Sequence, residues 1–185
     1  MARATPEVLR ARGAWKYDGS RRPAWADEPG PGEESVWDFP RPPRIEEEAR
    51  PVRVVHRDVV VAESTRALRV VETAGAPTVY VSERDVDRGL LVRGRGQSHC
   101  EWKGVAVHLD VVVAGHVAPE AAWTYPDPYP EFERLRSWIA FHPARLDACW
   151  LGDAKAVAQP GGYYGGWVTP DLAGPIKGGP GTGSW

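Results

Sequence analysis

The sequence predicts a mainly β domain, either a compact antiparallel β-barrel or a pair of packed sheets. From Pro51 onward, short runs rich in β-branched residues are separated by turn residues, which is typical of strands. Residues 104–113, GVAVHLDVVV, place a valine or leucine at every second position, the period of a half-buried strand. Long helical periodicity is missing from the sequence, which excludes a doubly wound α/β fold.

The first 45 residues predict an irregular N-terminal extension, because proline and glycine interrupt every candidate helix or strand. Within it, WDFPRPPR should run extended, since proline fixes its own φ and restricts the residue before it. We expect Trp37 and Phe39 to lie on the surface of the domain or in a groove. The alternative is a disordered leader that carries two isolated aromatic residues.

The core domain is expected over residues 46–159 and starts with short strands. His56 to Asp58 predict the turn of a hairpin, and SERDVDRGLL predicts a short helical turn with Ser82 as its N-cap. The expected strands are VRVVH (52–56), VVVA (59–62), ALRVVET (67–73) and TVYV (78–81).

The strand at 104–113 is expected to bury its odd-numbered residues, Val105 to Val113, in the core, and to turn Ala106, His108 and Asp110 toward solvent or a cavity. PEFERLRSW (130–138) predicts one or two helical turns, and WIAFHPARLDACWL (138–151) predicts two short strands around Pro143. Residues 160–185 are too rich in glycine and proline to build a core, so we expect an ordered but irregular C-terminal arm.

Composition excludes several function classes. A formal net charge of -2 argues against nucleic-acid binding, which needs surplus lysine and arginine. The sequence lacks an apolar run long enough for a secretion signal or a membrane span, so we expect a cytoplasmic protein without membrane partners. Two separated cysteines, Cys100 and Cys149, exclude a four-cysteine zinc site, and no metal or other cofactor is expected.

Familiar catalytic patterns are missing as well. GGPGTGS lacks the lysine and the following helix of a phosphate-binding loop, and the five histidines show no HxH or HExxH spacing. A Ser/His/Asp triad lacks a GxSxG elbow, so Ser98 is interpreted as a turn residue. Asp85 and Asp87 fit a pair that caps a helix better than a metal-binding DxD pair. The catalytic residues, if there are any, remain unknown from the sequence.

HCEWKG (99–104) is the strongest candidate for a site. On an extended chain, Cys100 and Trp102 would point to one side, and Glu101 and Lys103 to the other. Cys100 then fits a small core residue better than a nucleophile, because Lys103 points away from it. Trp102 fits a residue that covers a cavity.

A second aromatic wall is predicted at Trp123 and Tyr125, which lie two residues apart and share a face. Such walls bind flat rings or cations, but they also fill cores, and both interpretations stand. Glu72 and Asp147 lie among apolar neighbours, where a carboxylate needs a partner or a ligand. Lys103 could be that partner in a structural ion pair, or all three could hold a ligand.

Several of these segments together resemble the domain-of-unknown-function family 427. They are VWDFPRPPR, RVVET, TVYV, HCEWKG, AWTYPDPYPEF, FHPARLDAC and GGYYGGWVTPDLAGPIKGGPGTGSW, which span residues 37–185. The resemblance implies a small β-tent-like fold of two sheets, whose zinc-binding relatives use four cysteines that this chain lacks. It also implies a pocket framed by aromatic side chains. The residues carried over to it are Trp102, Trp123 and Tyr125, with Glu72, Tyr80, Lys103 and Asp147 as polar candidates.

Three functions follow as hypotheses. The first is a domain that binds a small, flat, polar metabolite, such as a nucleoside-like molecule, through Trp102, Trp123 and Lys103. The second is a small transferase or hydrolase, with a nucleotidyltransferase suggested by a label sometimes given to the family, in which Glu72 or Asp147 is the general base. The third is a protein-interaction module, including a homodimer formed by exchange of the C-terminal arm.

Overall fold

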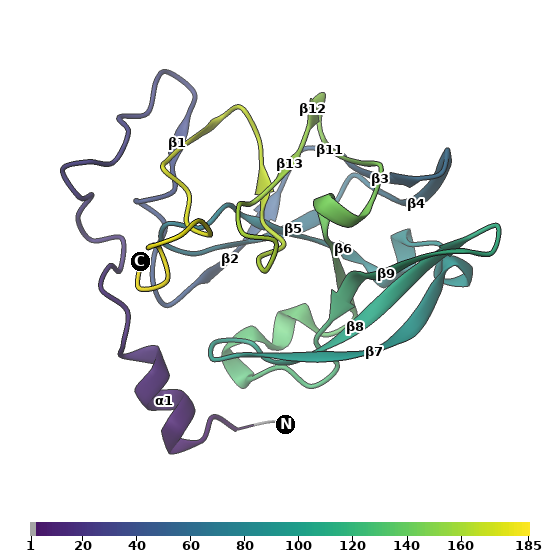
Figure 1. Ribbon diagram of the computed structural model, residues 1–185, viewed down its shortest axis with the longest axis horizontal. Helices are drawn as coiled ribbons and strands as arrows, with labels where there is room; N and C mark the ends of the chain where they lie inside the picture. Colours follow the sequence, from purple (N-terminus) through teal and green to yellow (C-terminus); the bar gives the residue numbers. More distant parts are fainter. Residues whose placement is uncertain (1–2) are drawn as a thin grey trace.

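The computed structural model describes residues 3–185, and most of its regular structure belongs to two sheets (Figure 1). The larger sheet has seven antiparallel strands in the order β2-β5-β6-β10-β9-β8-β7. In that order their bounds are Arg44–Glu48, Ala67–Val71, Thr78–Ser82, Trp138–Phe141, His116–Thr124, Gly104–Val113 and Leu91–Cys100. The strand β7 is therefore an edge strand of this sheet.

The smaller sheet has four strands in the order β12-β11-β3-β4, with the bounds Ala154–Lys155, Ala148–Leu151, Val52–His56 and Val59–Ser64. The predicted hairpin between β3 and β4 is confirmed, and Arg57 and Asp58 turn the chain with positive φ values of 50° and 62°. The prediction of a mainly β, two-sheet domain is confirmed. Within residues 3–185 neither sheet closes into a barrel.

Short helices and strands complete the described chain. The helix α1 (Pro6–Arg12) precedes the sheets, and the 3-10 helices are η1 (Glu83–Asp85), η2 (Arg88–Leu90), η3 (Pro130–Leu135) and η4 (Pro143–Arg145). As predicted, Ser82 caps η1, because its hydroxyl accepts a hydrogen bond from the backbone N–H of Arg84. Two further strand pairs are β1 (Glu34–Ser35) with β15 (Leu172–Ala173), and β13 (Val157–Ala158) with β14 (Trp167–Val168).

The seven-stranded sheet buries apolar side chains on both of its faces. One cluster joins it to the four-stranded sheet, and a second cluster, around Tyr80 and Leu135, covers the opposite face. The predicted alternation of 104–113 holds at its C-terminal half, where Val111 and Val113 are buried. The prediction that Val105 is buried is wrong: it is 45% exposed, because its end of β8 meets solvent instead of the second sheet.

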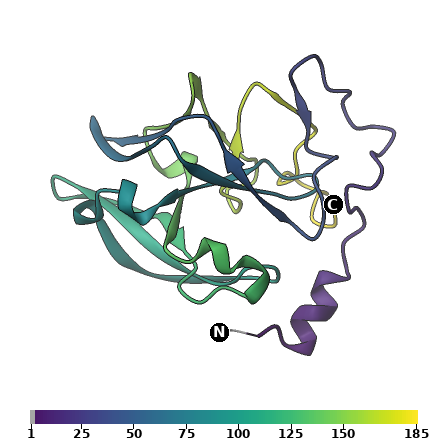
Figure 2. The same cartoon turned by 180° about the vertical axis from the view of Figure 1, so that it is seen from behind.

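The N-terminal extension contributes to the core, contrary to the surface position predicted for its aromatic residues. Trp37 is fully buried and Phe39 is 5% exposed. Trp37 packs edge-on against Tyr17 and Trp25, and Trp185 from the other end of the chain joins them. Views from the front and from behind (Figures 1 and 2) both place the C-terminal residue beside this N-terminal segment.

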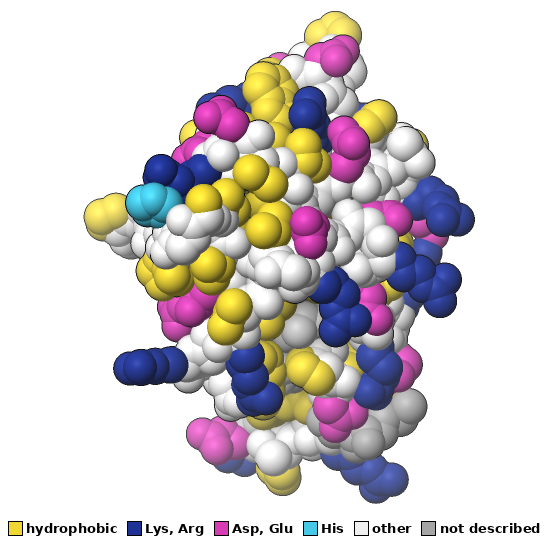
Figure 3. All heavy atoms as spheres, turned by 90° about the vertical axis from the view of Figure 1, so that its right-hand side faces the viewer, with side chains coloured by type: hydrophobic (Ala, Val, Ile, Leu, Met, Phe, Trp, Pro, Cys, Tyr) yellow, Lys and Arg dark blue, Asp and Glu magenta, His cyan; other side chains and the backbone are white. Residues whose placement is uncertain are grey.

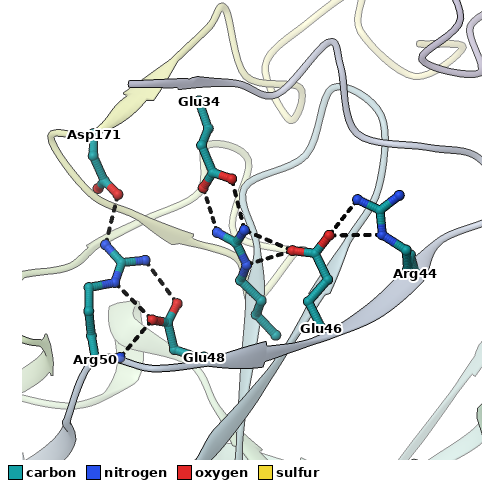
Figure 4. Close-up of polar contacts among 7 residues, drawn as sticks. Glu34, Arg44, Glu46, Glu48, Arg50 and Asp171 are labelled. Atoms are coloured by element: carbon teal, nitrogen blue, oxygen red, sulfur yellow. Dashed lines mark hydrogen bonds and ion pairs between the residues drawn. The ribbon is translucent and has the colours of Figure 1, made fainter. Parts of the chain in front are cut away.

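Ion pairs fasten both terminal segments to the larger sheet (Figure 4). Arg69 on β5 donates to Glu34 of β1 at 2.5 and 2.8 Å, and also to Glu46 of β2. Arg50 pairs with Glu48 and with Asp171 of the C-terminal arm, the latter at 2.7 Å. The arm thus folds back onto its own domain.

The face that carries the β7–β9 end of the molecule shows blue and magenta side chains intermixed with apolar ones (Figure 3). The exposed apolar residues of the three neighbouring strands β7, β8 and β9 include Val92, Val105 and Val117. Among the described residues, every helix falls short of the length and apolar character needed to cross a lipid bilayer.

Candidate functional site

A cavity of about 670 Å³ lies between the seven-stranded sheet and the terminal segments. One wall comes from the ends of β5 and β6 and from the β7–β8 hairpin. The other comes from Trp15, from residues 162–165 and from Lys177. A cavity of this size accommodates a small metabolite.

Five of the seven predicted site residues line this cavity: Glu72, Tyr80, Lys103, Trp123 and Tyr125. They come from four different places in the sheet, so strand pairing is what gathers them. Tyr80 lies on β6 and Trp123 on β9, with their ring centroids 6.5 Å apart and nearly perpendicular.

Trp102 lies outside the cavity lining, which corrects the prediction that it covers the ligand. Residues 101–103 form the turn between β7 and β8, so the extended alternation assumed for HCEWKG does not apply there. The indole is 5% exposed and packs in the cluster with Phe132 and Leu135. The Arg12 guanidinium lies 5.2 Å from its ring centroid and covers it from the solvent side.

Asp147 is not part of the cavity lining, which corrects the expectation that it shares a pocket with Lys103 and Trp123. Its carboxylate is 59% exposed and lies 3.4 Å from His56 Nδ1. It accepts a 2.6 Å hydrogen bond from the backbone N–H of Arg57 and so holds the β3–β4 turn. Apolar neighbours in the sequence did not mean apolar neighbours in space.

Lys103 is a cation without an acidic partner. Within residues 3–185, no carboxylate oxygen lies within 4.0 Å of its ammonium nitrogen. Burial lowers the pKa of Lys103, but the neighbouring Cys100 thiol and the Tyr125 and Tyr80 hydroxyls raise it well above its usual value. The side chain is therefore charged at neutral pH, and Glu72 is a nearby carboxylate that also raises its pKa without forming an ion pair with it.

Two tyrosines beside Lys103 present buried hydroxyl groups to the cavity. Tyr80 is fully buried and Tyr125 is 4% exposed, and burial raises the pKa of both hydroxyls. Tyr80 Oη makes no hydrogen bond of good geometry among the described residues, although the polar groups of Trp123 and Tyr125 lie close enough to lower its pKa against the effect of burial. A buried hydroxyl without a partner is costly, so this atom favours a bound polar group or water.

Glu72 belongs to a polar cluster contributed by the terminal segments. Its Oε1 accepts a 3.0 Å hydrogen bond from Arg41 and lies 3.9 Å from the Lys177 ammonium. Lys177 is 4% exposed and packs over the rings of Trp15 and Tyr164, at 4.5 and 4.9 Å. Burial lowers the pKa of Lys177. The sequence prediction missed these flanking residues, because nothing local connects Trp15 with Lys177.

The cavity lining also includes Ser98, His108, Glu120 and Arg145, and His108 on β8 pairs directly with Trp123 on β9. The only sequence signal for these residues was the position of His108 on the polar face of β8, for which a cavity was one of two expected surroundings. Ser98 was interpreted as a turn residue, but it lies within β7. The cavity lining therefore holds a second set of polar side chains besides Glu72, Tyr80 and Lys103.

Both cysteines are free thiols. Cys100 lines the cavity and is partly exposed, so the interpretation of Cys100 as a core residue applies only in part. Burial raises the pKa of Cys149 to about 12. No group of three or more His, Cys, Asp or Glu side chains within residues 3–185 is placed to hold a metal ion.

Comparison with protein families gives a match over the central part of the chain. Residues 44–152, more than half of the chain, match a family described as a domain of unknown function (DUF427) and labelled NTP_transf_9. No curated protein matches the chain. The matched segment holds Glu72, Tyr80, Lys103, Trp123 and Tyr125, whereas Trp15, Lys177 and residues 162–165 lie outside it.

Proposed function

We propose, from the premise that this chain belongs to the DUF427 family, that its cavity binds a small molecule with a flat ring and an anionic group. The observation that carries the proposal is Lys103, a cavity cation without a carboxylate partner. An anion bound there would supply the missing counter-charge.

The ring of the ligand would contact the aromatic lining. Trp123 and Tyr125 lie on the sheet side, and Tyr164 lies on the arm side of the same cavity. Aromatic rings bind other rings by offset or edge-on stacking. The free hydroxyl of Tyr80 would give such a ligand one directional hydrogen bond.

An enzyme that uses Glu72 or Asp147 as general base is less well supported. Asp147 lies outside the cavity, and Glu72 already accepts a hydrogen bond from Arg41 and faces Lys177. Around Glu72 the geometry supports binding better than proton abstraction. The two free cysteines support a reducing compartment, so we place this binding function in the cytoplasm.

The test uses isothermal titration calorimetry with three probes: adenosine monophosphate, nicotinate and adenosine. We expect at least one of the anionic probes to bind, and adenosine to bind more weakly than the monophosphate. Lys103→Met should weaken binding of the anionic probe at least about tenfold, since a charge-assisted contact is lost. Lys155→Met, an exposed lysine outside the cavity lining, is the matched control.

Two outcomes would contradict the proposal. One is that both anionic probes fail to bind at millimolar concentration. The other is that Lys103→Met and Lys155→Met bind the anionic probe as tightly as the wild type does.

A further inference from the structure

Three side chains in the cavity lining lie in a row, in which the Ser98–His108 contact is a hydrogen bond and the His108–Glu120 contact is a close approach without hydrogen-bond geometry. Ser98 Oγ lies 2.9 Å from His108 Nε2, and His108 Nδ1 lies 3.2 Å from Glu120 Oε1. A carboxylate only accepts hydrogen bonds, so the proton of the neutral imidazole belongs on Nδ1. His108 Nε2 is then free to accept the hydroxyl proton of Ser98. This is the order of nucleophile, base and orienting carboxylate used in acyl transfer.

Strand pairing brings the three residues together. Ser98 on β7 pairs with Ala106 on β8, so His108, two residues further along β8, shares its face as a diagonal neighbour. Between β8 and β9 the register shifts at Leu109 and Val111, opposite Glu120. Bulges of this kind redirect a side chain.

Glu120 is held in an uncommon backbone conformation at that bulge. Its φ is 50°, in the left-handed region, and its backbone N–H donates to Asp110 Oδ1 at 2.7 Å. A non-glycine residue in that region is unfavourable, and such positions concentrate at functional sites. The conformation turns the carboxylate toward His108.

Gly96 leaves the room that the His108 and Glu120 side chains occupy. A Cβ atom on Gly96 would lie 2.0 Å from Glu120 Oε1 and 2.8 Å from His108 Nδ1. Any side chain at this position of β7 would displace the carboxylate from the imidazole. The lack of a side chain at Gly96 thus leaves the space that Glu120 and His108 need to approach each other.

The charge state of Glu120 suits an orienting role. The close approach of His108, and then the hydrogen bond from Arg145, lower the pKa of its carboxyl group. Arg145 Nη1 lies 3.2 Å from Glu120 Oε2 and also donates to the Glu120 carbonyl at 2.9 Å. The carboxylate is therefore ionised at neutral pH and positioned to stabilise an imidazolium.

Backbone N–H groups without an acceptor within residues 3–185 also line the arm side of the cavity. Residues 162–165 line it, and their backbone N–H groups donate to no acceptor among the described residues. Free backbone N–H groups are the donors that stabilise tetrahedral intermediates in acyl transfer.

From this geometry we propose that Ser98 and His108 are catalytic residues for the hydrolysis of small carboxylic esters, with Glu120 as a positioning residue. Ser98 Oγ forms a bond to the acyl carbon while its proton passes to His108 Nε2. The ester C–O bond then breaks, and the leaving alkoxide takes that proton. Water, deprotonated by His108, releases the carboxylic acid from the acyl-serine and restores the Ser98 hydroxyl. The proposal does not rest on ligand binding at Lys103.

The test measures hydrolysis of p-nitrophenyl acetate by the full chain. Ser98→Ala and His108→Gln should each lower kcat/KM at least about 100-fold, the scale of a lost general base. Matched controls are Ser20→Ala and His116→Gln, exposed residues outside the cavity lining, which should hydrolyse the ester at the wild-type rate. Circular dichroism checks that each variant is folded.

Glu120→Gln separates positioning from a structural role. The amide should lower kcat at least about tenfold, because it no longer fixes the tautomer of His108. The KM for p-nitrophenyl acetate should stay unchanged, because Glu120 acts through His108 and not on the ester. A purely structural disturbance of the cavity would change KM as well, and Glu120→Asp should restore part of kcat only if the carboxylate positions the imidazole.

A fluorophosphonate probe gives a readout that is independent of turnover. Intact-mass and peptide analysis should find one adduct, on Ser98, that is absent in Ser98→Ala. The proposal is overturned by the absence of both adduct and hydrolysis in the wild type, by an adduct on another residue, or by hydrolysis that survives Ser98→Ala. Hydrolysis lost only in Cys100→Ala would assign the reaction to the thiol. None of these results depends on the calorimetry with adenosine monophosphate.

Discussion

The two walls of the cavity are built in different ways. The wall within residues 44–152 comes from paired strands, and register alone places Ser98 and His108 side by side. The opposite wall comes from the segments before and after that domain, which carry short strands and few paired residues. They are held by buried polar anchors such as Arg41, which donates hydrogen bonds to Glu72, Tyr17, Trp185 and Thr73.

The two walls therefore suit different roles: the strand wall holds reacting groups in place, and the flanking wall encloses the ligand. Strand register fixes relative positions over short distances and resists change, so it suits groups that must stay within hydrogen-bond distance. Segments held by a few anchors can differ between members of a family while the sheet stays the same. We therefore expect the strand wall to govern the reaction and the flanking wall to govern which ligand fits.

Arg41→Ala tests the flanking wall and should have the largest effect. Its side chain is 3% exposed and donates to Glu72, to the carbonyls of Tyr17 and Trp185 and to that of Thr73. Its removal leaves these acceptors without a donor, so the free energy of unfolding should fall by about 3 kcal/mol. Urea denaturation measures this, with the exposed Arg21→Ala as control. Equal midpoints for the two variants would refute the anchoring role.

Gly96→Ala tests the strand wall. The new Cβ would displace the flexible end of Glu120, so we expect the free energy of unfolding to change by less than about 1 kcal/mol. Ester hydrolysis should nevertheless fall at least about tenfold, because the carboxylate leaves His108. The control is Gly179→Ala, where a Cβ meets no atom within 4 Å. Full activity in Gly96→Ala would show that the glycine has no part in arranging the pair.

Acid should weaken the flanking wall through the anchor formed by Glu48, Arg50 and Asp171. Burial raises the pKa of Glu48, but hydrogen bonds from Arg50 lower it by more, so that the pKa lies below the usual 4.5. A lowered pKa means that this stability is fully present above pH 4.5 and is lost as pH falls through the lower value.

The measurement compares urea unfolding at pH 6 and pH 3. Between these pH values the wild type should lose about 1 kcal/mol more than Glu48→Gln, which lacks the titrating group. Glu63→Gln, whose side chain is 66% exposed, serves as the control and should follow the wild type. Parallel losses in the wild type and Glu48→Gln would count against the anchor.

The smallest effect is expected for Glu47→Gln. Glu47 pairs with Arg134 of η3, but the two side chains are 69% and 51% exposed. Exposed ion pairs contribute little, so the free energy of unfolding should change by less than about 0.5 kcal/mol. A loss above 1 kcal/mol in urea denaturation would show that exposed pairs hold this molecule as firmly as the buried anchors do.

Local patterns predicted the fold well. The strands at 52–56, 59–64 and 78–82, the hairpin turn and the Ser82 cap follow from β-branched runs and capping residues that act within a few positions. The burial of Trp37 was missed, because its partners Trp25 and Trp185 lie far away in the sequence.

The candidate site could be predicted only in part. Lys103, Trp123 and Tyr125 carry their own chemical signal, and they do line the cavity. Ser98 and His108 carry no such signal, because they lie close together only through the β7–β8 register. A search for GxSxG could not find them, since that pattern belongs to only one of the folds that build such a site. Asp147 shows the converse error, in which an apolar sequence context belonged to an exposed turn.

The unequal burial of the two thiols has a practical consequence. Cys149 is 1% exposed with a raised pKa, whereas Cys100 opens onto the cavity, so a maleimide dye at neutral pH should attach at Cys100. The unmodified chain thus carries its own attachment point for a fluorescent reporter. Such a dye would register occupancy of the cavity in solution without any engineered substitution.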